Sequence, residues 1–411
     1  MGAEGGRLSL PDWGVSLLVP KDALKPGYIE DVFLAVLLEP QDLPSLSSSQ
    51  TSLSPVVLAG PPGLSFSKPV VLSFGHSACL QQDGWEIGVY HCDSIFSEGS
   101  EQSWVKLVTV GQESPSCPIL THLDFSSCFL LTDFLSRFCL VGQSKPGQRA
   151  ARNLSVVMLG RKHGQELLLE VHVTGENQAS LQALLRTRQK LGMRLLHKPR
   201  PLKLEDGAGD LCLKVVGCGP GWSVARPSKT QQELNCGQVW AGLGEPHFNL
   251  ALEHQDPSVQ QISLDFTVFQ KQLRDFGQTV SVCLELSTLS SPTSRTSACS
   301  SLVASSSGCS SLPSSPLQAF TLPTEVRTAL CSSLDGEVTS GVDWRSLAVG
   351  LRLGRHLDYF RTRPSPTDCL LTLWESQQND QAAITDLLNI VRVIGKPEVA
   401  AGLEKKVGSW V

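Results

Sequence analysis

The sequence is poor in aromatic residues and has no long apolar run. Aromatic side chains make up 6% of its 411 residues, and no apolar run reaches the ~18 residues that a membrane-spanning helix needs. The opening MGAEGGRLSL lacks the basic and apolar regions of a secretory signal, and Gly6 stands where a myristoylation signal has Ser or Thr. We therefore expect neither a leader, a lipid anchor nor a membrane span in this sequence.

A clustered basic region is also missing. The 34 Lys and Arg residues are mixed along the chain with 39 Asp and Glu residues, and the formal net charge is −5. Nucleic-acid binding needs a basic face, so we expect no nucleic-acid partner. Apolar residues make up 41% of the chain, enough to build sizeable cores, and its length fits two to four domains of roughly 100–200 residues.

The 13 cysteines form no C-x-x-C pair, and their number is odd. Most of them lie inside apolar segments, as Cys139 and Cys283 do. Free cysteines behave as small core residues in a reducing compartment. We therefore expect a cytoplasmic chain without disulfides. Since no second pair stands at ligand spacing from His91 and Cys92, we also expect no bound metal and no cofactor.

Residues 1–145 contain short β-type runs bounded by Pro and Gly. GVSLLVP and PVVLSFG are examples, rich in apolar and β-branched residues and bounded by turn residues. Runs at this spacing favour an all-β sandwich over a βαβ fold. We predict a first β-sandwich domain over residues 1–145.

Residues 150–287 show the same β pattern, interrupted by one helix. NQASLQALLRTRQKLG has apolar residues at helical spacing, basic residues opposite them and Gly192 as its stop. Its predicted apolar stripe consists of Leu181, Leu184, Leu185 and Leu191. We predict a second β-sandwich covered by this helix.

The composition changes abruptly over residues 288–316, where serine dominates and aromatic residues are almost absent. Such a segment buries too little apolar surface to fold, so we predict a flexible linker. The Ser-Pro pairs at 291–292 and 315–316 are candidate phosphorylation sites.

Residues 317–411 carry only helix-type patterns, and they predict a compact bundle of six short helices. One of these begins in the stretch SGVDWRSLAVGL, where Asp343 is placed as an N-cap. Trp344, Leu347 and Ala348 follow at the three-to-four-residue spacing of a buried face. Trp374 is a second large core candidate.

The segment from Ser332 to Glu375, which includes the Asp343-Trp344-Arg345 triplet, resembles the death domain of the uncoordinated-five class of netrin receptors. GGRLSLPDWGVSLLVPKDAL and FCLVGQS resemble the ZU-five (ZU5) β-sandwich of the same receptors. LCLKVV and QVWAGLG are similar to their UPA domain. The resemblance covers essentially the whole chain, in the order ZU5, UPA and death domain.

This resemblance implies a non-enzymatic signalling module, the cytoplasmic part of a receptor in axon guidance, cell migration and apoptosis when netrin is lacking. It implies that the death domain docks back onto the β-domains in an inactive, closed form. Implied partners are a death-domain-binding kinase and a co-receptor of the deleted-in-colorectal-cancer type. Netrin would bind only an extracellular half that this sequence does not contain. The chain would then lie at the cytoplasmic side of the plasma membrane.

Two other readings stay open. Ankyrin-type cytoskeletal adaptors share all three kinds of domain, although they carry two successive ZU5 domains and this chain has room for one. A self-processing death-domain scaffold is the enzymatic alternative. Relatives of that kind cleave themselves at His-Phe-Ser, where the Ser hydroxyl attacks and the His acts as base.

At the matching position this chain has Phe134-Leu135-Ser136. The nucleophile is present, but Phe134 has no group that can take a proton, so we expect no self-cleavage. Two further motifs fail as catalytic signals. GHSAC at 75–79 lacks the final Gly of a nucleophile elbow. GCGPG at 217–221 contains Pro220 and is not followed by a helical pattern, so we interpret it as a turn and not as a phosphate-binding loop.

Overall fold

The fold is described from a computed structural model of the chain. The structure describes residues 1–93, 103–114, 117–226, 228–242, 244–286, 320–336, 342–378, 380 and 382–407. The predicted linker over residues 288–316 lies outside these residues.

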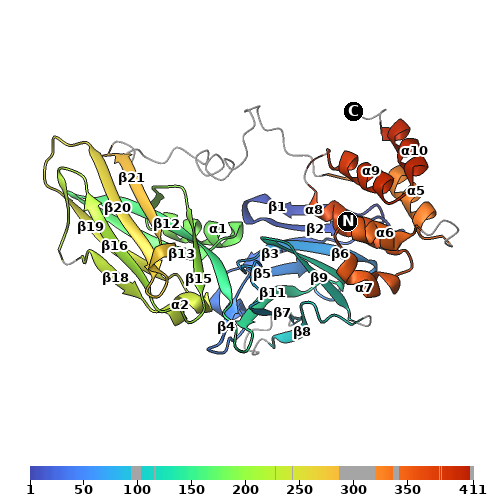
Figure 1. Ribbon diagram of the computed structural model, residues 1–411, viewed down its shortest axis with the longest axis horizontal. Helices are drawn as coiled ribbons and strands as arrows, with labels where there is room; N and C mark the ends of the chain where they lie inside the picture. Colours follow the sequence, from blue (N-terminus) through green and yellow to red (C-terminus); the bar gives the residue numbers. More distant parts are fainter. Residues whose placement is uncertain are drawn as a thin grey trace.

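Two antiparallel sheets form the N-terminal β-domain (Figure 1). The first has the order β1-β2-β6-β10-β9, and the second the order β3-β5-β11-β7-β8 with β4 also paired to β11. Their bounds are β1 Gly6–Leu10, β2 Val15–Val19, β3 Phe33–Leu37, β4 Gln50–Ser52, β5 Val56–Gly60, β6 Ser65–Gly75, β7 Trp85–Cys92, β8 Val105–Thr109, β9 Ile119–Leu123, β10 Ser127–Phe134 and β11 Arg137–Ser144.

The core of this domain lies between the two sheets. Strand side chains alternate between the two faces of a sheet, and Leu17, Leu72 and Leu130 of the first sheet are fully buried against the second, with Phe138 of β11 in the same cluster. The predicted all-β sandwich is therefore present.

A second pair of antiparallel sheets forms the middle domain. One has the order β14-β12-β13-β19-β17 with β15 also paired to β12, and the other β18-β16-β20-β21. Their bounds are β12 Ala151–His163, β13 Glu166–Gly175, β14 Arg194–Leu195, β15 Arg200–Glu205, β16 Leu211–Cys218, β17 Trp222–Val224, β18 Gln231–Leu234, β19 His247–His254, β20 Gln261–Gln270 and β21 Gln278–Glu285.

Two helices accompany these sheets, one more than the sequence pattern predicts. Helix α1 spans Gln178–Gln189 and is capped by Asn177, and helix α2 spans Cys236–Ala241 and is capped by Asn235. Six residues are too few for a helical period to show, which explains why α2 is missed. The predicted stripe of α1 is also one residue too long, because Leu191 lies beyond the end of the helix and is exposed.

Six α-helices of the described residues form the C-terminal helical domain, as predicted. Asp343 caps α6 by accepting a hydrogen bond from the backbone N–H of Arg345, and Ser365 caps α8 in the same way through Asp368 N–H. The bounds are α5 Thr324–Leu334, α6 Trp344–Gly350, α7 Leu357–Arg361, α8 Pro366–Gln377, α9 Ala383–Val393 and α10 Pro397–Val407, with the 3₁₀ turn η4 at Gly354–His356.

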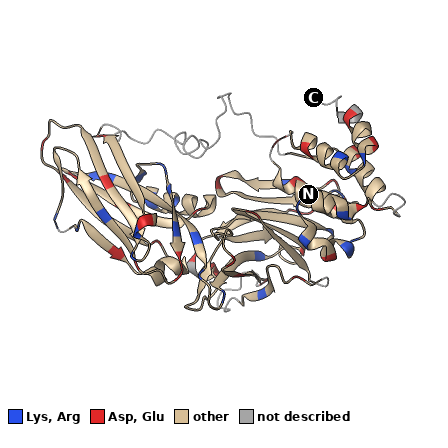
Figure 2. Cartoon of the chain, viewed as in Figure 1, with Lys and Arg blue, Asp and Glu red and all other residues tan. Residues whose placement is uncertain are grey.

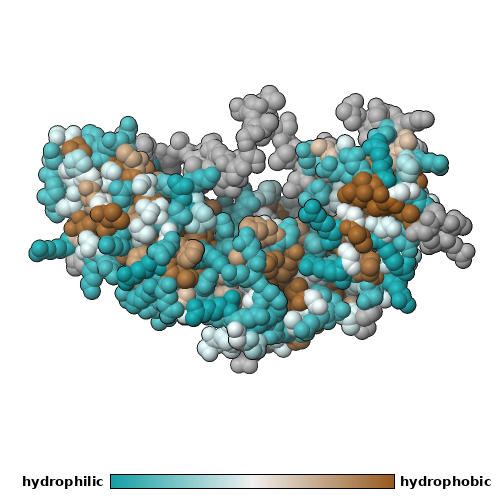
Figure 3. Space-filling view, in the orientation of Figure 1, coloured by the Kyte–Doolittle hydropathy of each residue, from teal (hydrophilic) through white to brown (hydrophobic). Residues whose placement is uncertain are grey.

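The three domains lie in a row. Figure 1 shows the middle domain and the helical domain at opposite ends of the N-terminal β-domain, with α8 beside β6. Acidic and basic residues are interspersed over all three domains in this view (Figure 2). Figure 3 shows apolar surface over the helical domain, where Val349 and Val393 are the exposed large apolar side chains among the described residues.

Candidate interdomain interfaces

The first sheet of the N-terminal β-domain is buried on both of its faces. Leu18, Val71 and Leu131 point away from the sandwich core, since their strand neighbours point into it, yet each is at most 7% exposed. Their outward face belongs to the same apolar cluster as the core of the helical domain. The full set of first-sheet side chains in that cluster is Leu18, Val71, Leu120, Phe129 and Leu131.

Polar contacts fix the helical domain on this face. Arg7 of β1 donates two hydrogen bonds from Nη1 and Nη2 to the carbonyl oxygens of Gln378 and Ser376, at 3.2 and 2.6 Å. These carbonyls lie at the C-terminal end of α8, where unpaired carbonyl oxygens and the helix dipole favour a cation. Arg7 therefore anchors one end of α8 to the edge strand of the sheet.

Two ion pairs cross the same interface. Lys68 Nζ of β6 lies 3.0 Å from a carboxylate oxygen of Asp368, and Arg363 Nη1 lies 2.9 Å from Asp133 Oδ2 at the end of β10. The Arg363 guanidinium also stacks over the ring of Tyr359, 4.3 Å from its centre. Apolar burial supplies the attraction, while these directional contacts define how α7 and α8 are seated.

A cluster of two imidazoles and one guanidinium closes the interface at β9. Arg355 Nη2 lies 3.1 Å from His122 Nδ1, and Arg355 Nε donates to His356 Nε2 at 2.9 Å. Burial, with the charge of Arg355, lowers the pKa of His122 to about 4 and that of His356 to about 3. Both histidines are therefore neutral near pH 7.

The interface between the two β-domains depends on Arg152. Its guanidinium, within the buried side chain, donates from Nη1 to the carbonyl oxygens of Val239 and Trp240 at 3.1 and 2.7 Å. Trp240 in turn stacks flat on Trp85 of the N-terminal β-domain, with ring centres 5.4 Å apart. Burial lowers the pKa of Arg152 to about 10, so Arg152 stays charged near pH 7. It thereby holds the C-terminal end of α2 at the interface between the two β-domains.

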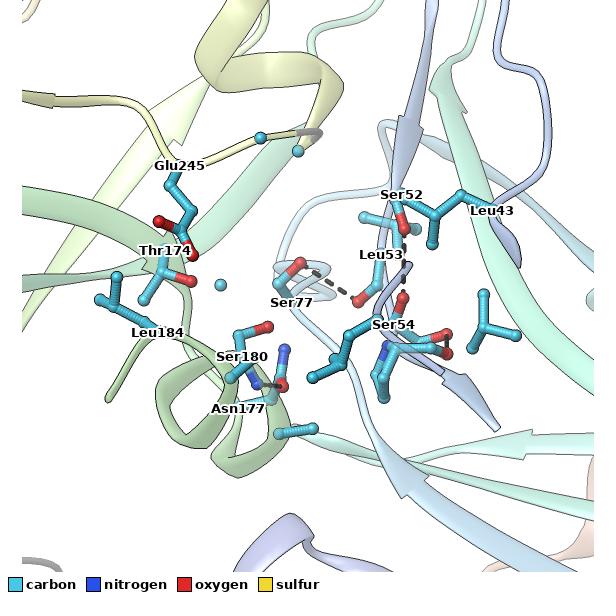
Figure 4. A pocket seen from close by; sticks show the side chains of 18 of the residues that line it. Leu43, Ser52, Leu53, Ser54, Ser77, Thr174, Asn177, Ser180, Leu184 and Glu245 are labelled. Atoms are coloured by element: carbon cyan, nitrogen blue, oxygen red, sulfur yellow. Dashed lines mark hydrogen bonds between the residues drawn. The ribbon is translucent and has the colours of Figure 1, made fainter. Parts of the chain in front are cut away.

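A cavity of about 590 Å³ lies beside Arg152, between the two β-domains (Figure 4). Ser77, Asn177 and Ser180 form a polar side, and apolar side chains such as Leu43 and Leu184 form much of the remainder. The polar groups are largely engaged with the protein: Ser77 Oγ donates to Leu53 O, and Asn177 Oδ1 accepts from Ser180 N–H. His172 also lines the cavity, and its Nε2 lies 2.8 Å from a carboxylate oxygen of Glu170.

The residues named from the death-domain resemblance lie in or beside the core of the helical domain. Trp344, Leu347, Ala348 and Trp374 are buried in it. Arg345 is more exposed, pairs with Asp343 and lies over the Trp344 ring at 4.6 Å. These residues therefore define the fold of the helical domain, and the surface contacts with the first sheet involve other residues.

Phe134, Leu135 and Ser136 lie at the turn between β10 and β11. Ser136 is fully buried, and its hydroxyl lies 3.0 Å from Cys92 O and 2.7 Å from Asp93 Oδ1. His91 of the neighbouring β7 packs edge-on against the Phe134 ring, with ring centres 5.9 Å apart, and its Nδ1 lies 3.3 Å from the same Asp93 oxygen. The hydroxyl is thus held by two acceptors, and no imidazole replaces the missing base next to it.

We predict that the purified chain remains intact. It should run as one species near 44.3 kDa, because Phe134 stands where the self-cleaving relatives have the imidazole that takes the proton of the serine. Denaturing electrophoresis and intact-mass spectrometry after prolonged incubation test this, with Ser136→Ala as the matched control. A pair of stoichiometric fragments that meet between Leu135 and Ser136, absent from the control, would contradict it.

Other kinds of site are not found in the described part of the chain. No group of three or more His, Cys, Asp or Glu residues there could hold a metal ion. None of its helices is long and apolar enough to cross a membrane.

Comparison with protein families agrees with this architecture. The family model of the ZU5 domain matches residues 1–93, that of the UPA domain residues 150–288, and that of the death domain residues 327–407. The order is consistent with both the netrin-receptor and the ankyrin resemblance. The chain thus carries a ZU5, a UPA and a death domain in that order, all of them non-catalytic interaction modules, and this composition supports a signalling function.

Proposed function

We propose that this chain is the intracellular signalling module of a netrin-type receptor, and that its docked death domain is the inactive state of that module. In the active state the death domain leaves the first sheet of the ZU5 domain and binds protein partners. A death-domain-binding kinase and a co-receptor of the deleted-in-colorectal-cancer type are the partners that the resemblance implies. Axon guidance and apoptosis are the processes that the module would control.

The observation that carries this proposal is the shared apolar cluster of the two domains. Five side chains of the first sheet lie in one buried cluster with the helices of the death domain, so α8 cannot present that face to a partner while it is docked. The polar part of the interface consists of a few ion pairs and hydrogen bonds at its edges, as between Lys68 and Asp368. Such pairs contribute little each, so a partner or a modification can shift the balance between docked and released states.

The order of the three domains is also consistent with the ankyrin-type adaptor, which stays the second candidate. The self-processing scaffold is disfavoured by Phe134, which stands where those relatives have the imidazole base. A spectrin pull-down separates receptor from adaptor, since capture of spectrin by the chain would support the adaptor.

Charge reversal on the ZU5 side of the interface is expected to release the death domain. Lys68→Glu together with Asp133→Lys sets each new side chain against a like charge, Asp368 and Arg363, and leaves the death domain sequence unchanged. Small-angle X-ray scattering should then show a larger radius of gyration and maximum dimension than for the unmodified chain.

Two further variants make this test specific. Lys106→Glu removes an exposed pair with Glu86 on β7 and β8, outside the docking contacts, and should scatter like the unmodified chain. Exchanging the charges of the second pair in the otherwise unmodified chain, by Asp133→Arg with Arg363→Asp, keeps the two charges opposite and should give a docked profile. Identical compact scattering from the unmodified and the charge-reversed chains would show that these contacts do not hold the domains together, and an extended profile from the unmodified chain would reject the closed state.

A further inference from the structure

The His122–Arg355–His356 cluster is chemically unusual for the middle of an interface. Arg355 Nη2 is 3.1 Å from His122 Nδ1, Arg355 Nε is 2.9 Å from His356 Nε2, and the two imidazole nitrogens are 3.4 Å apart. The two rings meet edge to face with centres 5.6 Å apart, His122 on the ZU5 domain and His356 on the death domain. Both domains therefore contribute to one site.

The donors and acceptors of this cluster determine its protonation state. A guanidinium has five N–H donors and no acceptor, so both imidazole nitrogens that face Arg355 must offer lone pairs. Each histidine is then neutral, and the 3.4 Å contact between the two nitrogens joins two acceptors. A proton added to either nitrogen would point an N–H at the guanidinium and place two cations in contact.

Two acidic residues lie near the cluster without pairing with its histidines: Asp124 is hydrogen-bonded to its own turn, and one oxygen of Glu113, Oε1, is buried without a hydrogen-bond partner. Asp124, next on the chain after β9, accepts hydrogen bonds from the N–H groups of Ser126 and Ser127. Glu113, on the segment before β9, accepts from the N–H of Gly111, and burial raises its pKa although the charge of Arg355 acts against this.

An aromatic ring and an ion pair lie on the other sides of the cluster. From β10 the cluster is faced by the Phe129 ring, and farther along the interface Arg363 is paired with Asp133. No carboxylate among the described residues forms a hydrogen bond or an ion pair with His122, Arg355 or His356. A second positive charge in the cluster would therefore lack a paired anion.

We propose that this cluster makes the docking of the death domain on the ZU5 domain acid-labile, with protonation of His122 or His356 releasing the death domain. The inference rests on the docked inactive state proposed above and adds a control of that state by pH.

The direction follows from the burial and charges at the interface. Burial first, then the charge of Arg355, lowers the pKa of His122 to about 4, against the opposing effect of Asp124. Burial, Arg355 and His122 lower the pKa of His356 to about 3. When the domains separate, both pKa values should return toward their ordinary value of about 6.5.

Docking should accordingly be strongest above about pH 6.5 and weaken as the pH falls toward the docked pKa values. By proton linkage a histidine whose pKa returns fully to about 6.5 reduces the docking equilibrium constant about tenfold between about pH 7.5 and 5.5. Because Arg355 stays beside His356 after separation, the pair should reduce it by between about tenfold and about 100-fold.

Histidine titration by NMR on the full chain tests this directly. Isotope-labelled imidazole signals are followed with pH and assigned by His122→Gln and His356→Gln, in which the amide oxygen can still accept from Arg355. In the unmodified chain neither histidine should gain a proton above about pH 5. In the Lys68→Glu, Asp133→Lys chain both should titrate at a higher pH than in the unmodified chain, His122 close to its ordinary value and His356 less so, because Arg355 stays beside it.

Each alternative outcome is informative. Ordinary titration of both histidines in the unmodified, docked chain would overturn the inference. Equally lowered values in the docked and charge-reversed chains would also overturn it, because the depression would then arise within each domain. If scattering shows that the unmodified chain is extended, the closed state itself is rejected, which is a failure of the proposed function and is distinguishable from the first two outcomes.

Discussion

Replacing Trp344 with alanine is expected to unfold the death domain or weaken it severely. Trp344 is 7% exposed, begins α6 and packs in the apolar cluster of the helices. Removing a buried Trp side chain costs about 3–5 kcal/mol, a large part of the 5–15 kcal/mol by which domains are usually stable. For a domain of 60–100 residues, each kcal/mol lowers the melting temperature by about 4–8 °C.

The measurement is thermal unfolding of the full chain followed by the helical circular dichroism signal, which comes mainly from this domain. Trp344→Phe should lower the melting temperature much less, because it keeps an aromatic ring in the core. Val349→Ala lies on the same helix at an exposed position and should leave the transition almost unchanged. A shift of only a degree or two for Trp344→Ala would contradict the assignment of this side chain to the core.

The helical domain could be predicted well from the sequence because its signals are local. Asp343 as a cap and the spacing of Trp344, Leu347 and Ala348 depend on neighbours within one helical turn, and the structure has them in those places. Apolar runs such as GVSLLVP and PVVLSFG predicted β2 and β6 for the same reason, whereas the five-residue strands β1 and β9 were not predicted. The short strand β4 and helix α2 were missed, since three and six residues carry no readable period.

The docking face had a sequence signal that was not recognised. A sheet with one solvated face alternates apolar and polar residues, whereas a sheet covered on both faces has continuous apolar runs. The runs Leu17–Val19 and Cys128–Leu131 are of the continuous kind, and both of their faces are buried. What these runs could not reveal is the covering element, because contacts between Lys68 and Asp368 join residues 300 positions apart.

Arg327→Met is expected to be as damaging as the loss of Trp344, for an electrostatic reason. Arg327 of α5 is paired at Nη1 with Asp368, at 2.6 Å, and at Nη2 with Glu375 of α8. Removing one partner of a buried ion pair costs about 3–5 kcal/mol, because the remaining charge is left buried without compensation. Here two carboxylates would be left, and Lys68 of the ZU5 domain could compensate only Asp368.

The stability lost in Arg327→Met should also depend on pH. Burial acts to raise the pKa of Asp368, but the charges of Arg327 and Lys68 outweigh it and hold that pKa below its ordinary value of 3.8. Such a carboxylate stabilises the fold above its ordinary pKa, and the contribution is lost as the pH falls through the folded value. The difference in stability between Arg327→Met and the unmodified chain should therefore be largest near pH 7 and shrink below about pH 4.

Thermal unfolding at several pH values measures this difference. Arg361→Met, at an exposed position on α7, is the matched control and should have little effect at any pH. The double variant Arg327→Met, Glu375→Gln removes one of the stranded charges and should recover part of the loss, which separates the electrostatic cost from lost packing. Equal stability of Arg327→Met and Arg361→Met near pH 7 would show that the buried pairs contribute nothing, and that α5 is held on α8 by its apolar side chains Val326, Leu330 and Leu334 alone.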